Sequence, residues 1–179
     1  MDKSLLSSHE SGIVHYQSVR DVALSELRAS AAFTAIALRF ASTTIEAARA
    51  DLPHLYEGTL EGLRRLEVAC PSLVASAAYV LELGPRDERH ALLALWSALC
   101  LSPISAGLGR SREQGVLYDA VIAHAEETTP DLSAGSTPKP HASELVAAFT
   151  RVLTARGALL RAQGKTELAM ASLERAVAL

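Results

Sequence analysis

Apolar residues recur at intervals of three and four along most of the chain, which is the period of an amphipathic helix. No stretch shows the strict two-residue alternation of a half-buried strand. The sequence therefore predicts an all-α fold of about seven antiparallel helices, arranged as helical hairpins or as an irregular bundle. The predicted helices are 19–50, 53–69, 71–84, 86–101, 112–128, 143–163 and 167–179.

Prolines and small polar residues determine the predicted helix boundaries. Pro53 is expected to end the first helix, because the residue before a proline is pushed out of the helical region. Pro71 is expected to start a helix at the first-turn position that proline favours, and Pro103 to end the fourth helix. The first helix is long, and Ser42-Thr43-Thr44 is the expected site of a kink within it.

Two segments fall outside this helical pattern. Residues 1–17 show little periodicity and are expected to form a flexible lead-in. Residues 129–141 contain three prolines, one glycine and several Ser and Thr, so we expect a mobile loop there. The rest of the chain, 18–179, is predicted to be a single all-helical domain, long enough to bury a core without disulfides or metals.

Composition supports the helical prediction and narrows the list of partners. Ala and Leu, both strong helix formers, supply 32 and 28 of the 179 residues. Seventeen basic against twenty acidic residues give a net charge of −3, without the basic surplus typical of nucleic-acid binding. Apolar stretches are interrupted before membrane-spanning length, and the first residues lack a signal-peptide core. We therefore expect a cytoplasmic protein with no nucleic-acid and no membrane partner.

Residue types used in catalysis and metal binding are present without the spacing that either requires. The densest group, His124 with Glu126 and Glu127, only partly shares one helix face. Cys70 and Cys100 are thirty residues apart and are interpreted as two buried thiols. No serine lies in a nucleophile-elbow sequence. The sequence predicts a protein that is not an enzyme and that uses no metal and no cofactor.

A glycine-rich turn, Gly107-Leu108-Gly109, leads into the predicted fifth helix beside Arg110 and Arg112. Backbone N–H groups at a helix N-terminus, together with two guanidinium groups, are able to hold an anion. No strand precedes this turn, and the lysine of a phosphate-binding loop is absent. Arg110 and Arg112 are candidate binding residues, and the alternative is a connector with solvated side chains.

The last thirty residues follow a fixed order of large and small positions. Large residues fill the space between two helices, small ones stand where the helices would cross, and a glycine marks the turn. These positions are Leu153, Gly157, Leu160, Gly164, Ala169, Leu173 and Ala176. The segment 150–179 resembles a tetratricopeptide repeat, a pair of antiparallel helices. It departs from that family at Arg156, where an aliphatic residue is usual, and in lacking a closing proline.

An earlier segment, 73–103, matches the same pattern more weakly. Its first-helix positions lie eighty residues before their counterparts, and its second-helix positions lie seventy-eight residues before theirs. The two-residue difference falls between Pro85 and His90, in the expected turn. The matching residues are Leu73, Ala77, Val80, Gly84, Ala91, Leu95 and Ala98, followed by Pro103.

The resemblance implies stacked helix pairs whose first helices line a concave groove. On the last pair, the groove-facing positions would be Arg151, Thr154, Ala158 and Arg161. Two arginines there suit an acidic peptide or a C-terminal carboxylate, although solvated side chains explain them equally well. The predicted function is a non-enzymatic scaffold or adaptor that binds another protein or an acidic peptide.

An alternative function is an all-α ligand-sensing or regulatory domain. Aromatic residues are only 4% of the chain, so a cluster of them would be informative. Phe33, Phe40, Tyr79 and Trp96 are the candidates to line a small-molecule pocket between helices. An enclosed pocket of several hundred cubic ångströms would favour sensing, and an open groove would favour the scaffold.

The C-terminal helix is the predicted self-association surface. A repeat array needs a polar outer face on its last unit, and Leu173, Ala176 and Val177 would otherwise be left partly bare. We expect either that the native chain continues past Leu179 or that a second copy covers this face as a homodimer.

Overall fold

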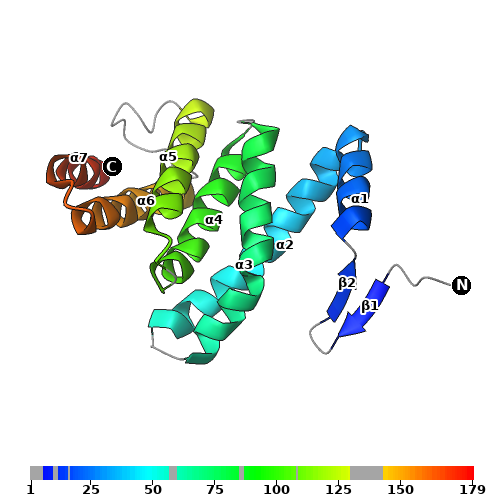
Figure 1. The fold of residues 1–179 in the computed structure, drawn as a ribbon. Helices are drawn as coiled ribbons and strands as arrows, with labels where there is room; N and C mark the ends of the chain where they lie inside the picture. Colours follow the sequence, from blue (N-terminus) through cyan, green and yellow to red (C-terminus); the bar gives the residue numbers. More distant parts are fainter. Residues whose placement is uncertain are drawn as a thin grey trace, which may run out of the picture. The chain divides into compact units, whose positions relative to one another are not determined.

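The computed structural model describes residues 6–9, 12–15, 17–56, 60–84, 87–107, 109–129 and 143–179. Seven helices are present in these ranges, which confirms the all-α fold class (Figure 1). They are α1 Gln17–Ala29, α2 Phe33–Tyr56, α3 Leu60–Leu83, α4 Glu88–Gly107, α5 Ser111–Thr128, α6 Ser143–Ala162 and α7 Thr166–Val177. The loop predicted at 129–141 lies outside the described residues, apart from Thr129.

The chain divides into two compact units, Met1–Ile36 and Ala37–Leu179. This boundary falls within α2, and we had placed the only division at the end of the lead-in, residue 17. The first unit contains a hairpin that we did not predict, formed by β1 Leu6–His9 and β2 Gly12–His15. The strands pair antiparallel, with Leu6 opposite His15. Four-residue strands are too short for their alternation to stand out in the sequence.

The predicted helix 19–50 is interrupted between Ala29 and Phe33, not at Ser42–Thr44. Ser30 explains the break, because its hydroxyl donates to the carbonyl of Leu27 at 2.8 Å. The backbone N–H of Ser30 also bonds to Leu27, and the Ser30 carbonyl accepts from Phe33 at the start of α2. A serine that binds the backbone of the preceding turn competes with helix continuation.

Three predicted boundaries at prolines are wrong. Pro53 lies inside α2, Pro71 inside α3 and Pro103 inside α4. Residues 53–56 therefore extend α2, and the rest of the predicted helices 53–69 and 71–84 merge into α3. Proline removes one intrahelical hydrogen bond, which leaves the carbonyl four residues earlier without its usual donor. Pro53 and Pro71 are exposed and Pro103 is half-buried, so water or a ligand has access near these carbonyls.

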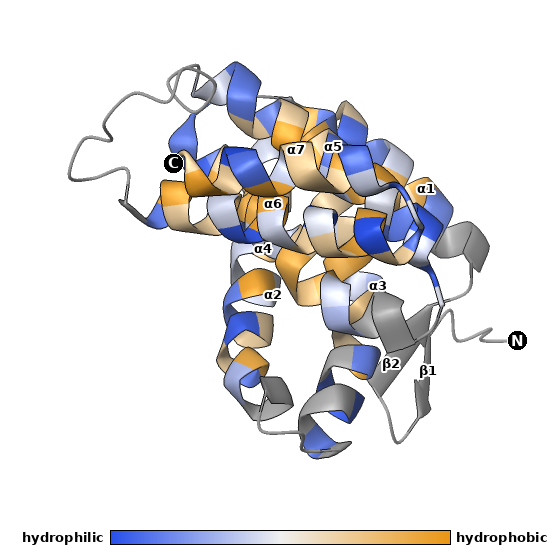
Figure 2. Ribbon diagram, turned by 90° about the vertical axis from the view of Figure 1, so that its left-hand side faces the viewer, coloured by the Kyte–Doolittle hydropathy of each residue, from blue (hydrophilic) through white to orange (hydrophobic). Residues whose placement is uncertain are grey.

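Helix α4 is the centre of the unit Ala37–Leu179, where it packs against α3, α5 and α6. Its buried residues point in every direction around the helix axis rather than along one stripe. They include Ala91, Leu93, Ala94, Leu95, Trp96, Ala98, Cys100 and Leu101. By contrast, hydrophobic and hydrophilic residues alternate along α2, α5 and α6 in Figure 2, as expected of amphipathic helices.

The two segments with the repeat pattern form two packed helix pairs, α3 with α4 and α6 with α7. The large first-helix residues Leu73 and Val80 are buried, as are Leu153 and Leu160. Each first helix ends at a glycine with a left-handed backbone, at φ 72° for Gly84 and 75° for Gly164. The pairs are therefore alike in both their buried positions and their turns.

Gly157 lies where α6 and α7 make their closest approach, as the pattern predicted. A Cβ atom there would come within 2.8 Å of Leu173 Cγ and 3.3 Å of the carbonyl oxygen of Ala169. Both residues belong to α7, so an added methyl group requires the Leu173 side chain to move or α7 to shift away from α6. Arg156, the departure from the family pattern, donates from Nε to Asp119 Oδ1 on α5 at 2.6 Å.

We predict that Gly157→Ala destabilises the protein by about 1–3 kcal/mol through overpacking of this crossing. Gly115→Ala is the matched control, because the added Cβ would meet only Leu159 Cδ2 at an ordinary 3.6 Å. That variant should gain about 0.5–1 kcal/mol from helix propensity. Urea unfolding of both variants measures the difference, and equal stability of the two would contradict the close approach.

Candidate functional site

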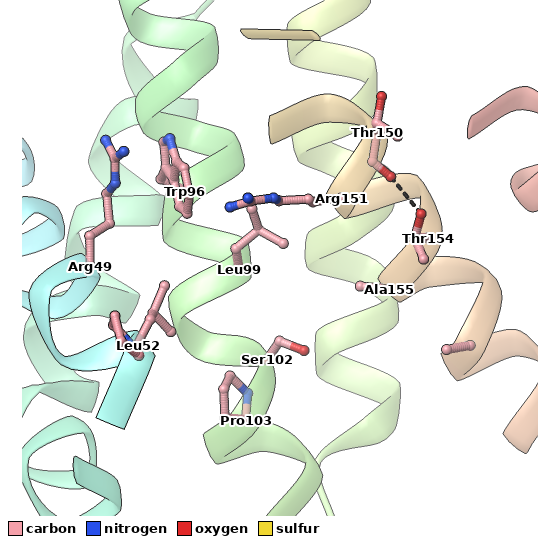
Figure 3. Close-up of a pocket in the computed structure, with 12 residues that line it drawn as sticks. Arg49, Leu52, Trp96, Leu99, Ser102, Pro103, Thr150, Arg151, Thr154 and Ala155 are labelled. Carbon is pink, nitrogen blue, oxygen red and sulfur yellow. Dashed lines mark hydrogen bonds between the residues drawn. The ribbon is translucent and has the colours of Figure 1, made fainter. Parts of the chain in front are cut away.

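Three helices of the unit Ala37–Leu179 line an open groove of about 940 Å³ (Figure 3). Helix α2 lines one side, α4 the floor and α6 the other side. The lining residues are Arg49, Leu52, Pro53, Trp96, Leu99, Ser102, Pro103, Thr150, Arg151, Thr154, Ala155 and Ala158. On each helix these positions are spaced by three and four, so each helix contributes a single stripe. The groove is mostly apolar with a polar upper end.

Trp96 lies between two guanidinium groups at that polar end. The Arg49 Cζ atom is 3.9 Å from the centre of the Trp96 ring system, and the Arg151 Cζ atom is 5.6 Å from it. Figure 3 shows the two arginines reaching toward the indole from α2 and α6. Both distances fit cation–π contacts. Trp96 is 7% exposed, and its buried indole N–H has no acceptor among the described residues.

The two arginines differ in their charge partners. Arg49 Nη2 donates to Glu144 Oε1 at 2.8 Å, and both side chains remain partly exposed. Arg151 is exposed and makes no ion pair with any residue that the structure describes. Arg151 therefore offers a guanidinium whose donors are open to a ligand.

Two hydroxyl groups complete the polar lining. Thr154 Oγ1 donates to the carbonyl of Thr150 at 2.8 Å, which leaves its oxygen lone pairs as acceptors. Ser102 Oγ accepts from the Tyr118 hydroxyl at 2.7 Å, which leaves its own proton available. The site thus presents cations and hydroxyls along an apolar slot.

The predicted groove residues are brought together in part. Arg151, Thr154 and Ala158 line the groove as expected. Arg161 continues the same face of α6 but is not among the lining residues. Arg49 was missed as a binding residue, and Trp96 was predicted to line a small-molecule pocket rather than this groove. Their contact joins positions 47 residues apart, and no local pattern indicates it.

Arg110 and Arg112, the candidate anion-binding residues, lie at the N-terminal end of α5. Arg110 is the N-cap residue of α5 and lines a second, apolar groove of about 400 Å³ between α3, α4 and α5. Arg112 is exposed and lines neither groove. The side chain of Arg110 makes no capping hydrogen bond at this helix end, and anion binding there stays a prediction.

The four aromatic candidates for a pocket are placed as follows. Phe40 and Tyr79 pack edge to face with ring centres 6.0 Å apart. Trp96 lies in the groove with the two arginines. Phe33 belongs to the other compact unit. Of the four residues, Trp96 is the one that lines a groove described here.

The predicted self-association face is largely covered within the chain. Ala176 is buried, and Leu173 is half-buried against Gly157 of α6. Val177 is 88% exposed. Helix α7 turns the stripe of Leu173 and Ala176 toward α6. Self-association through α7 stays a prediction, and Val177 is the most exposed of the three residues.

Cys100, Glu126 and His124 were among the residue types considered for chemistry, and their surroundings are as follows. Burial raises the pKa of the Cys100 thiol to about 12, so it stays protonated at neutral pH. Glu126 pairs with Arg175 rather than joining His124 and Glu127. Among the described residues, no three His, Cys, Asp or Glu side chains gather as metal ligands.

Comparison of the chain with protein-family models, with curated proteins and with solved structures gives no match. Across the described residues, no helix is both long and apolar enough to cross a membrane. The function of the groove is therefore inferred from its own geometry and chemistry.

His124 provides a test of buried charge in this unit. Its imidazole is buried and its Nε2 has no partner among the described residues. Burial lowers the pKa of His124, the nearby imidazole of His90 lowers it further, and Glu127 acts in the opposite direction. The unfolded chain thus takes up a proton near pH 6.5 that the folded chain does not. Stability is full above that pH and falls as the pH drops toward the folded-state pKa.

We predict that the urea midpoint falls between pH 7.5 and pH 5.5, and that it falls less in His124→Gln. The glutamine side chain has no proton to gain over this range, so the difference between the two slopes isolates His124. Identical slopes for the two proteins would show that the imidazole is not the group responsible.

Proposed function

We propose that this protein is a helical scaffold that binds a partner protein by seating an acidic segment in the groove between α2, α4 and α6. The observation that carries the proposal is the Arg151 guanidinium, which lacks an ion pair among the described residues and lies beside Trp96 at the end of an apolar slot. A carboxylate is the group that matches a guanidinium with open donors.

The size and lining of the groove favour a polypeptide segment over a bare ion. An ion would use only the polar end, whereas Leu52, Leu99 and Ala155 extend the slot with apolar surface. A charged hydrogen bond contributes about 1.5–3 kcal/mol, or roughly a 10- to 150-fold change in Kd. The apolar slot adds the remaining affinity and selects for segments with small or apolar side chains between the acidic ones.

The resemblance to a tetratricopeptide repeat supports this function for the last helix pair. The groove-facing positions of α6 are those that the first helix of such a repeat presents. The earlier pair departs from that arrangement, because α4 lines the groove and α3 does not. We therefore propose a repeat-like hairpin, α6–α7, joined to helices packed in a different order. The cytoplasm remains the proposed location, consistent with two free cysteines.

The test uses an acetylated, amidated octapeptide of alternating Glu and Ser, read by the fluorescence of Trp96, the single tryptophan of the chain. The same peptide with Gln in place of Glu is the uncharged control. We expect the acidic peptide to change the Trp96 emission in a saturable way, with Kd rising with salt concentration. Arg151→Gln should weaken binding about tenfold or more, by loss of a charged hydrogen bond.

Arg161→Gln is the matched protein control, because it removes one positive charge from the same face of α6 outside the groove. It should leave Kd within about twofold, the residual effect of an exposed charge. Equal losses in Arg151→Gln and Arg161→Gln would mean that only net charge is sensed. Absence of binding by the acidic peptide would overturn the proposed function.

A further inference from the structure

Among the described residues, three prolines lie inside helices, and two of them line the groove. Pro53 follows Arg49 by four residues in α2, and Pro103 follows Leu99 by four residues in α4. All four residues line the groove. The third proline, Pro71 in α3, lines neither groove described above and is exposed.

The two prolines change the main-chain hydrogen bonding of the helices that line the groove. In an α-helix the carbonyl of residue i accepts the N–H of residue i+4, and proline has no N–H to give. The carbonyls of Arg49 and Leu99 therefore cannot receive this bond. Residues i and i+4 share one face of a helix, so each of these carbonyls lies on the groove side of its helix.

The groove then offers a ligand both hydrogen-bond donors and hydrogen-bond acceptors. Arg151 offers donors to an anion, and the two carbonyls offer acceptors to N–H groups. A helical segment uses its N–H groups internally beyond its first turn, so it has few to give. An extended polypeptide has free main-chain N–H groups at every second residue on each side.

We propose that the groove binds its acidic partner segment in extended form, with main-chain N–H groups of the segment donating to the carbonyls of Arg49 and Leu99. This inference rests on the proposed function. It adds the conformation of the partner segment and the carbonyl groups that would bind its main chain. Pro53 and Pro103 act as positioning residues, since they keep the two carbonyls free of the intrahelical bond. Recognition by carbonyls is independent of side-chain identity, and Arg151 supplies the selection for acidic segments.

The first experiment changes only the ligand. Two analogues of the Glu–Ser octapeptide replace alternate amide N–H groups by ester oxygens, one analogue in each register. They retain all four carboxylates and the extended character of a charged segment. We expect one register to bind about threefold to tenfold more weakly than the parent peptide, the effect of losing neutral hydrogen bonds. The other register should bind nearly as the parent does.

The second experiment replaces the prolines that line the groove. Pro53→Ala and Pro103→Ala each restore an N–H that can occupy the carbonyl of Arg49 or Leu99. Each variant should raise the thermal midpoint, because the helix regains a bond, and weaken peptide binding about threefold to tenfold. Pro71→Ala is the matched control, which should raise the midpoint in the same way and leave peptide binding unchanged.

The outcomes separate this inference from the proposed function. If the acidic peptide binds and depends on Arg151, but both ester analogues and both groove proline variants bind like their parents, the extended main-chain readout is wrong and the scaffold function stands. If the acidic peptide does not bind at all, both fail. Should a proline variant unfold, the ester analogues decide the question with the unaltered protein.

Discussion

The burial of α4 on all but one stripe is the constraint from which the rest of the Ala37–Leu179 unit follows. A helix that packs against three others needs small residues wherever a neighbour comes close. Ala91, Ala94 and Ala98 meet this need, and each is fully buried. Polar groups on such a helix must find partners within the protein. Ser97 donates to the carbonyl of Ala94, and the carbonyl of Ala98 accepts from Gln114 of α5.

The groove is a consequence of that packing. Helices α2 and α6 flank α4 without filling the space between them, so one stripe of α4 remains uncovered from Trp96 to Pro103. Trp96 is 7% exposed, and the guanidinium groups of Arg49 and Arg151 lie close to its ring system at cation–π distances. The aromatic ring on α4 thus helps to hold both cations at the groove.

Periodicity in the sequence predicts the helices well and the groove only in part. The turns at Gly84 and Gly164 were predictable because a left-handed backbone strongly favours glycine. The face of α6 was predictable because Arg151, Thr154 and Ala158 share one stripe. Pro53, Pro71 and Pro103 were misjudged because local sequence does not reveal whether water or a ligand reaches the freed carbonyl. The contact of Arg49 with Trp96 depends on how distant helices meet, which no window of sequence contains.

Two ion pairs tie α5 to the final hairpin. Arg156 of α6 bonds to Asp119, and Arg175 of α7 bonds to Glu126 and lies over the Phe149 ring at 5.1 Å. Together with the buried contacts between α5 and α6, they hold the hairpin in position without relying on the covalent link through residues 130–142. These contacts all lie outside residues 130–142, so a change in the length of that segment leaves them in place. The chain can therefore gain or lose residues there during evolution, or receive an inserted domain, while the groove keeps its geometry.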